Sequence, residues 1–212
     1  MAHGDFGVGT FNALDGEMAA VDGQFYHLRD DGSVTAVDPV ELTPFAAVTF
    51  FRGEAELDLE HPYDRDDLLE WVDQTVPSDN LFYAIRIDGT FDSVTTRTVR
   101  RQHHPYAGLL AAAQGQAQMQ FTKTSGTIVG FRAPQYAQGM TVAGYHLHFV
   151  DDSRTMGGHV LDFSIRSGVV RLDLETDLHV EMPTSAEFLD ADLDGDDKSD
   201  AIEQSENVSG HD

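Results

Sequence analysis

The amino-acid sequence predicts a β-dominated α+β fold, with sheets packed against each other and few short helices. Most of the 212 residues fall into short segments that are typical of strands, and few segments are typical of helices. Turn-forming dipeptides of Gly, Asp and Ser separate these segments. The hydrophobic fraction of 41% is enough for a folded core in spite of a high charge.

The strands are expected between these turn signals. Hairpins are predicted at three places, where residues 24–29 and 33–37 flank Asp30-Asp31-Gly32, residues 81–87 and 91–99 flank Asp88-Gly89, and residues 118–122 and 127–131 flank Ser125-Gly126. An apolar run at residues 46–51 is typical of a buried strand, with a central place in a sheet as one option. Further strands are expected at residues 142–150, 159–165, 169–174 and 178–182.

Helices are expected in three segments. Residues 64–76 begin with acidic residues, carry an apolar stripe of Leu68, Leu69, Val72 and Val76, and stop at Pro77. Residues 106–114 follow Pro105, and residues 185–206 have room for one or two short helices. We expect residues 1–212 to form one unit, which can also be divided into two intergrown β subdomains at about 1–105 and 106–206, with residues 207–212 as a disordered tail.

The charge and composition exclude several classes of function. Asp and Glu number 37 against 13 Lys and Arg, a formal net charge of −24, which repels nucleic acid and anionic membranes. The absence of cysteine excludes disulfides and thiolate metal sites. No apolar run reaches the roughly 20 residues of a membrane helix. The first residues do not have the pattern of a signal peptide, so we expect a cytoplasmic protein.

The acidic surface also indicates where the protein works. Lys123 and Lys198 are the only two lysines. An acidic surface with few lysines is expected of a protein that lives in very high salt, where charge repulsion is screened over about 3 Å at 1 M. The alternative is an acidic protein of an ordinary environment.

The segment GYHLHFVDDSRTMGGHVLDF, residues 144–163, carries the chemistry-bearing residues. His146 and His148 are two positions apart, so on a strand both imidazoles project from the same face. After a polar turn, His159 opens the next strand, which can fold back beside the first. Three imidazoles with an open position are a ligand set for catalytic zinc. The alternative is two histidines on a half-buried face and a third in a turn.

Three blocks resemble the α-acetolactate decarboxylase family. They are GDFGVGTFNALDGEM at residues 4–18, GTF…TRTVRRQ…PY at residues 89–106 and HLH…GGHVLDF at residues 146–163. The blocks follow one another in the family's order, and the resemblance extends over nearly the whole chain. The resemblance implies two mixed β-sheets in a bi-domain arrangement, and two such chains assembled as a homodimer. It also implies a zinc ion held by His146, His148 and His159, and acetolactate as the small-molecule substrate.

The resemblance carries further site residues onto this sequence. The glutamate of the LDGE motif corresponds to Glu17, the arginine of the RTV motif to Arg97, and the threonine beside the substrate to Thr10. A C-terminal glutamate of the family corresponds best to Glu206, with Glu203 as the alternative. The chain begins almost at the GDFG motif, whereas relatives usually start several tens of residues earlier, so an upstream start or a shortened fold is expected. Arg100 stands where relatives often have proline, and we expect this change to be tolerated.

The implied reaction converts 2-acetolactate to acetoin and CO₂. A divalent ion bound by the ketone and hydroxyl oxygens would stabilise the enediolate left by decarboxylation. Arg97 would bind the carboxylate, and Glu17 or Glu206 would donate a proton or ligate the metal. Three imidazoles also suit manganese, iron or cobalt. Two competing hypotheses are a cupin-like metal-dependent oxygenase and a non-catalytic protein that binds a metal or a small acid.

Overall fold

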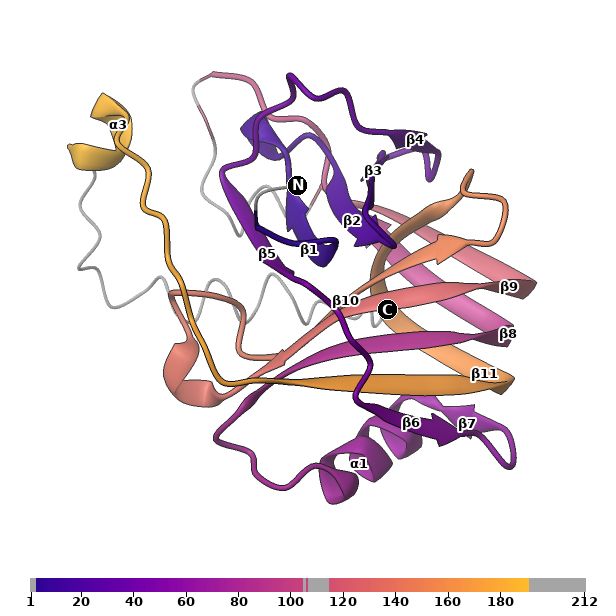
Figure 1. Cartoon of the computed structure of the whole chain (residues 1–212). Helices are drawn as coiled ribbons and strands as arrows, with labels where there is room; N and C mark the ends of the chain where they lie inside the picture. Colours follow the sequence, from indigo (N-terminus) through magenta and orange to yellow (C-terminus); the bar gives the residue numbers. More distant parts are fainter. Residues whose placement is uncertain (1–2, 105, 107–114, 191–212) are drawn as a thin grey trace.

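Two antiparallel sheets form the body of the protein in a computed structural model, which describes residues 3–104, 106 and 115–190 (Figure 1). The smaller sheet has the strand order β4-β3-β2-β1-β5. Its strands are β1 (Phe6–Thr10), β2 (Glu17–Val21), β3 (Gln24–Leu28), β4 (Val34–Ala36) and β5 (Phe45–Thr49). The prediction of a β-dominated chain with two sheets is confirmed, and the pairings between named strands are antiparallel rather than mixed.

The larger sheet has the order β10-β9-β8-β11-β6, and β7 pairs with β11 outside this path. Its strands are β6 (Ala55–Asp58), β7 (Tyr63–Asp64), β8 (Phe82–Thr98), β9 (Ala117–Ala133), β10 (Gly144–Asp151) and β11 (Gly157–Glu175). β10 pairs with both β9 and the start of β11, so four strands close on themselves. The chain passes from one sheet to the other between β5 and β6. A division into subdomains at about residue 105 stays a prediction.

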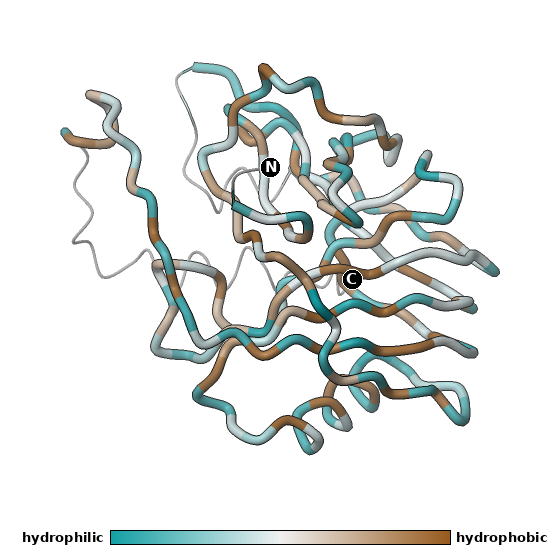
Figure 2. Tube along the Cα trace, viewed as in Figure 1, coloured by the Kyte–Doolittle hydropathy of each residue, from teal (hydrophilic) through white to brown (hydrophobic). Residues whose placement is uncertain are grey.

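Buried hydrophobic residues form two cores. One core lies between the two sheets, where Phe6, Val8 and Leu28 face Val129 and Val150. The other core includes residues of the larger sheet and the helix α1 (Arg65–Thr75), whose Leu68, Leu69 and Val72 are buried. Along the tube in Figure 2, hydrophobic and hydrophilic stretches alternate within the strands. Alternation of this kind is typical of strands that bury one face.

The helix at residues 64–76 is confirmed as α1. Asp64 caps its N-terminus, because its carboxylate accepts a hydrogen bond of 2.9 Å from the backbone N–H of Asp67. The other regular helices of the described residues are short: η1 (Asn12–Leu14), η2 (Gln135–Ala137) and α3 (Ala186–Leu189). Of the helix predicted at residues 106–114, only Tyr106 is described, and most of the segment 185–206 also lies outside the described residues.

Two of the predicted hairpins are wrong. The Asp88-Gly89 and Ser125-Gly126 dipeptides lie inside the continuous strands β8 and β9. Gly89 stands opposite Gly126 on one side and Gly168 on the other. A Cβ atom at Gly89 would lie 2.5 Å from the carbonyl oxygen of Ser167. These glycines therefore allow close approach of neighbouring backbones, which a sequence pattern cannot distinguish from a turn.

Of three further segments predicted as strands, two contain strands in the structure and one does not. The hairpin at residues 24–37 is confirmed as β3 and β4. The run at residues 46–51 forms part of β5, which is an edge strand rather than a central one and is partly exposed. Residues 178–182 form no strand, and Leu178, Val180 and Met182 are exposed. Among the described residues, no helix has both the length and the apolar character that crossing a membrane requires.

Candidate metal centre and active site

Three buried histidines meet where β10 and β11 pair. His146 and His148 alternate with Leu147 on β10, so both rings project from the face opposite Leu147. His159 on β11 is the direct register partner of His148. One ligand nitrogen from each ring lies within 4.8 Å of the others. The predicted convergence of the three imidazoles is confirmed, and the group can hold a metal ion.

The ring of His148 is oriented by the smaller sheet. Its Nδ1 lies 2.7 Å from the backbone oxygen of Met18 on β2. A carbonyl oxygen only accepts hydrogen bonds, so Nδ1 donates and the Nε2 of the neutral ring presents its lone pair. This Nε2 lies 3.2 Å from the Nε2 of His146. A histidine whose other nitrogen donates to a backbone carbonyl is a typical metal ligand.

The environment of His146 favours its neutral form. Burial lowers the pKa of His146 to about 3, and the positive charge of Arg97 acts in the same direction. A neutral imidazole has the free electron pair that a metal requires. Three such rings without a thiolate fit zinc and also other divalent ions of the first transition row.

Glu17 and Arg97 lie beside the histidines. Arg97 on β8 is the register partner of His159. Glu17 begins β2, and its Oε2 lies 3.8 Å from the Nε2 of His148. Its other carboxylate oxygen, Oε1, lies 3.8 Å from the Nη1 of Arg97. Both side chains are buried, so a carboxylate and a guanidinium group share one buried site with the histidines.

Thr10 lies on the same face as Glu17, because the two residues are register partners between β1 and β2. Its hydroxyl donates a hydrogen bond of 2.7 Å to the backbone oxygen of Gly16, which precedes Glu17. Thr10 thus supports the turn that leads into the site. Glu206 and its alternative Glu203 both lie outside the described residues.

Two contacts at the site carried no signal in the sequence. The side-chain oxygen of Gln116 accepts a hydrogen bond of 3.0 Å from the Nη1 of Arg97. The ring of Phe45 on β5 is nearly parallel to that of His146, with 6.3 Å between the ring centres. Gln116 lies outside every motif, and Phe45 comes near the histidines only because β5 pairs with β1.

The fold and the site together define a β-sheet protein with a buried three-histidine group next to an Arg–Glu pair. The sequence profile of the α-acetolactate decarboxylase family matches residues 1–195. The chain therefore belongs to the α-acetolactate decarboxylase family.

Comparison with individual proteins supports this assignment to the family. An α-acetolactate decarboxylase of Methylococcus capsulatus is 47% identical over 205 residues, which cover 97% of this chain and 78% of that protein. One of Bacillus subtilis is 43% identical over 204 residues, covering 96% of this chain and 80% of that protein. The crystal structure of α-acetolactate decarboxylase from Bacillus subtilis strain 168 superposes with a TM-score of 0.95 at 42% identity, covering 98% of this chain and 88% of that chain.

Proposed function

We propose that this protein is a carboxy-lyase that converts 2-acetolactate to acetoin and CO₂ with a divalent metal, zinc in the first place, bound by His146, His148 and His159. The observation that carries the proposal is the meeting of three buried imidazoles with Glu17 and Arg97 in one site. Membership of the family supplies the substrate class. When bound there, the metal would act as a Lewis acid toward the negative charge that develops as CO₂ leaves.

Arg97 binds the substrate in this proposal. Its guanidinium is buried, and Gln116 and Glu17 lie on its Nη1 side. An arginine can bind a carboxylate through two parallel hydrogen bonds, which orients the bond that must break. The substrate carboxylate then leaves as CO₂, and the electron pair of the broken bond stays on the rest of the molecule.

In this proposal, Glu17 delivers a proton to the substrate. Acetoin forms when a proton reaches the carbon that has lost CO₂, and delivery from one side yields a single enantiomer. The Oε2 of Glu17 lies 3.8 Å from the Nε2 of His148 on a buried side chain, so Glu17 is positioned to deliver a proton from one side. Glu206 is the second carboxyl group of the proposal, and it shares with Glu17 the roles of proton donor and additional metal ligand.

The test measures acetoin from acetolactate with metal-free and zinc-loaded protein at molar salt. We expect no acetoin after chelation and recovery on addition of zinc. His148→Ala should lose metal and activity, because it removes one of three ligands. His61→Ala is the matched control, since His61 is exposed and does not belong to the cluster. A zinc-loaded protein that binds acetolactate without releasing acetoin would contradict the proposal. Bound iron with oxygen consumption would favour the oxygenase instead.

A further inference from the structure

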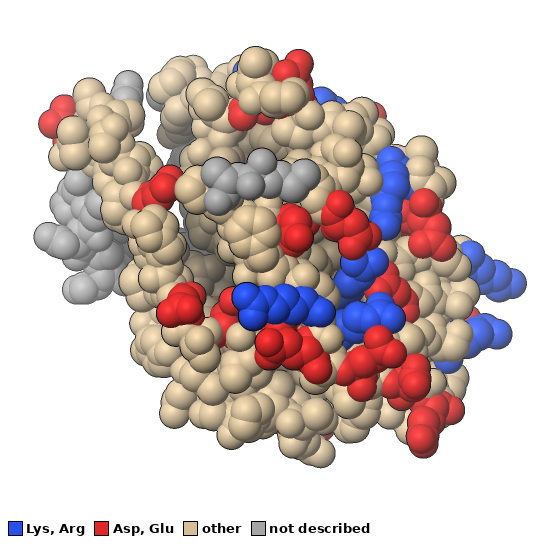
Figure 3. Space-filling view, in the orientation of Figure 1, with Lys and Arg blue, Asp and Glu red and all other residues tan. Residues whose placement is uncertain are grey.

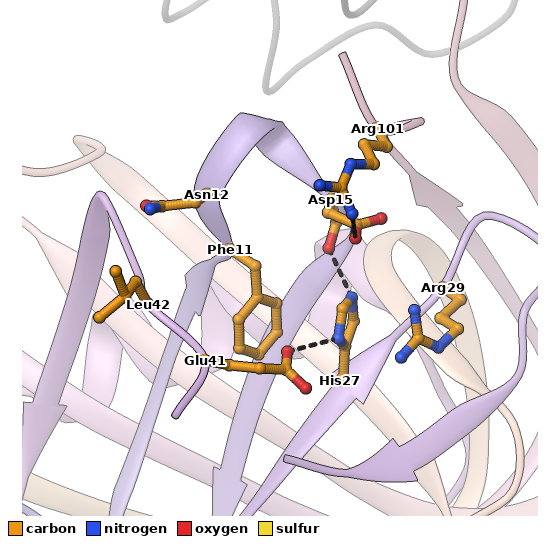
Figure 4. A pocket seen from close by; sticks show the side chains of 8 residues that line it. All are labelled: Phe11, Asn12, Asp15, His27, Arg29, Glu41, Leu42 and Arg101. Carbon is orange, nitrogen blue, oxygen red and sulfur yellow. Dashed lines mark hydrogen bonds and ion pairs between the residues drawn. The ribbon is translucent and has the colours of Figure 1, made fainter. Parts of the chain in front are cut away.

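A second cluster of charged and aromatic residues lies on the face of the smaller sheet opposite to the face that carries Glu17 (Figure 4). It borders a cavity of about 330 Å³. Its members are Phe11, Asp15, His27, Arg29, Glu41 and Arg101. His27 on β3 stands opposite Met18 in the β2–β3 register, and Glu17 stands opposite Leu28. Because side chains alternate along a strand, His27 projects away from the face that carries Glu17.

His27 is buried and held on three sides. Its ring stacks on Phe11 with 4.1 Å between ring centres and an angle of 26°. Its Nδ1 lies 2.9 Å from the Oε2 of Glu41, and its Nε2 lies 2.5 Å from the backbone oxygen of Asp15. Figure 4 shows the ring between these two oxygens. His27 belongs to none of the motifs identified in the sequence, so these contacts come from the structure alone.

The hydrogen-bond partners determine the protons on this ring. A carbonyl oxygen and an ionised carboxylate both accept hydrogen bonds and donate none. Both contacts can be hydrogen bonds at the same time only if each ring nitrogen carries a hydrogen and Glu41 is ionised. Among the other charged groups at this cavity, the carboxylate of Asp15 pairs with Arg101 at 3.1 Å, and Arg29 directly follows the strand of His27.

The contact to Asp15 holds an unusual turn. Ala13 and Leu14 have positive φ angles of 64° and 52°, and Gly16 has a φ angle of 78°. Residues other than glycine are strained in this region and persist there only when the surrounding structure holds them. The turn ends at Gly16, one residue before Glu17. The structure holds it through His27, through Arg101, and through the backbone of Val99, whose oxygen accepts from Gly16 N–H at 3.2 Å.

We propose that His27, doubly protonated and paired with Glu41, is a positioning residue that fixes the turn at Asp15 and thereby places Glu17 in the active site. This inference rests on the proposed role of Glu17. The same positioning extends to Met18, which is the register partner of His27. The backbone carbonyl of Met18 orients the ring of His148. His27 acts through the backbone and touches neither substrate nor metal ligand.

The protonation of His27 can be tested without substrate. Nitrogen NMR of ¹⁵N-histidine-labelled holoenzyme distinguishes a ring with two N–H groups from either neutral form, and His27→Phe assigns the signal. We expect two protonated nitrogens on His27 at neutral pH. A neutral His27 ring at that pH would overturn the proposal. This experiment does not depend on the reaction, so its outcome is separate from that of the proposed function.

The positioning role is tested by kinetics. His27→Phe keeps the stacking on Phe11 and removes both N–H groups. We expect kcat to fall about 10- to 100-fold, with KM changed less than about twofold and zinc content unchanged, because a misplaced catalytic group costs this much. The same change made in a Glu17→Gln background should lower kcat by less than about threefold, because the effect passes through Glu17. Equal losses in the two backgrounds would refute the role.

A matched control and a second variant complete the test. His61→Phe should leave kcat unchanged, since His61 also stacks on an aromatic ring, Tyr63, at 4.2 Å but lies outside this cluster.

If His27→Phe fails to fold, the variant Glu41→Gln tests the proposal instead. In this variant the NH₂ group of the glutamine amide can donate a hydrogen bond to an unprotonated ring nitrogen of His27. A carboxylate only accepts hydrogen bonds and cannot do so. The wild-type kcat should fall through the pH at which NMR shows His27 losing a proton, and the kcat of Glu41→Gln should not fall there. Parallel declines would overturn the proposal.

Discussion

At the scale of single residues, burial and backbone contacts determine what the site can do. His148 is fully buried, and the carbonyl of Met18 selects its tautomer. His146 stays neutral because the protonated ring would be desolvated and would face Arg97. In each of these two rings, a neighbouring residue on another strand favours the form whose nitrogen lone pair can bind a metal. The spacing of the histidines in the sequence showed which rings share a face, and it contained no information on these neighbours.

Arg97→Lys tests the geometry of carboxylate binding. A lysine keeps the positive charge but loses the planar pair of donors and the contact to Gln116. We expect KM for acetolactate to rise about 10- to 100-fold, corresponding to roughly 1.5–3 kcal/mol for a charged hydrogen bond, with a smaller change in kcat. Steady-state kinetics of the zinc-loaded enzyme measure this. Arg166→Lys, on an exposed arginine paired with Asp92, is the control. An unchanged KM would remove Arg97 from substrate binding.

At the scale of elements, strand pairing brings the site together. The turn between β10 and β11 sets the register in which His148 faces His159. Asp151 organises this turn, because its Oδ1 accepts from the backbone N–H groups of Thr155 and Met156 at 2.8 and 2.9 Å. Its other oxygen accepts from the hydroxyl of Ser153. Burial opposes the ionisation of Asp151, but these hydrogen bonds outweigh it and lower its pKa.

Asp151→Asn should destabilise the protein in a pH-dependent way. The lowered pKa of Asp151 means that its ionised form contributes stability above about pH 4, its unfolded pKa, and that this is lost as the pH falls through the folded pKa. At pH 7 we expect the variant to lose about 1 kcal/mol, or roughly 2–4 °C in Tm. The difference should shrink near pH 3.

Thermal unfolding at the two pH values measures this effect. Asp152→Asn is the control, because Asp152 is the exposed neighbour in the same turn. A Tm difference that is the same at pH 7 and pH 3 would show that the charge of Asp151 does not support the turn.

At the scale of the whole molecule, charge is the dominant feature. The formal net charge is −24. On the face in Figure 3, basic side chains lie among acidic ones. Arg86 pairs with Asp88 on its own strand at 2.7 Å and with Asp22, in the turn between β2 and β3, at 2.6 Å, so it links the two sheets. Thirteen basic residues cannot neutralise 37 acidic ones, and the remaining charges repel one another.

Salt should therefore control stability. We expect Tm to fall when KCl is lowered from about 2 M to about 0.1 M, because the screening length grows from about 3 Å near 1 M to about 10 Å at 0.1 M. Calorimetry of the zinc-loaded protein at constant pH measures this. Sucrose serves as the control for effects of a cosolute without charge. A Tm that is the same at both salt concentrations would contradict adaptation to high salt.

Local rules explain what was predictable from the sequence. Alternation along a strand placed His146 and His148 on one face, and acidic residues at the start, an apolar stripe and a proline predicted the helix α1. These signals involve residues a few positions apart, so they need no knowledge of the fold. Glycine was ambiguous at Gly89 and Gly126, because the same residue serves tight turns and close contacts between strands.

The sequence by itself determined the β-rich architecture, the acidic surface and the three candidate metal ligands. Only the tertiary structure brought Glu17 to within 3.8 Å of His148 and placed His27 behind the turn at Asp15. The physical reason is that both contacts depend on how the strands pair: Glu17 and His148 lie in different sheets, more than a hundred positions apart, and His27 reaches Asp15 because β3 pairs with β2. Their energies depend on which strands pair and on what is buried between them, and no local pattern records either.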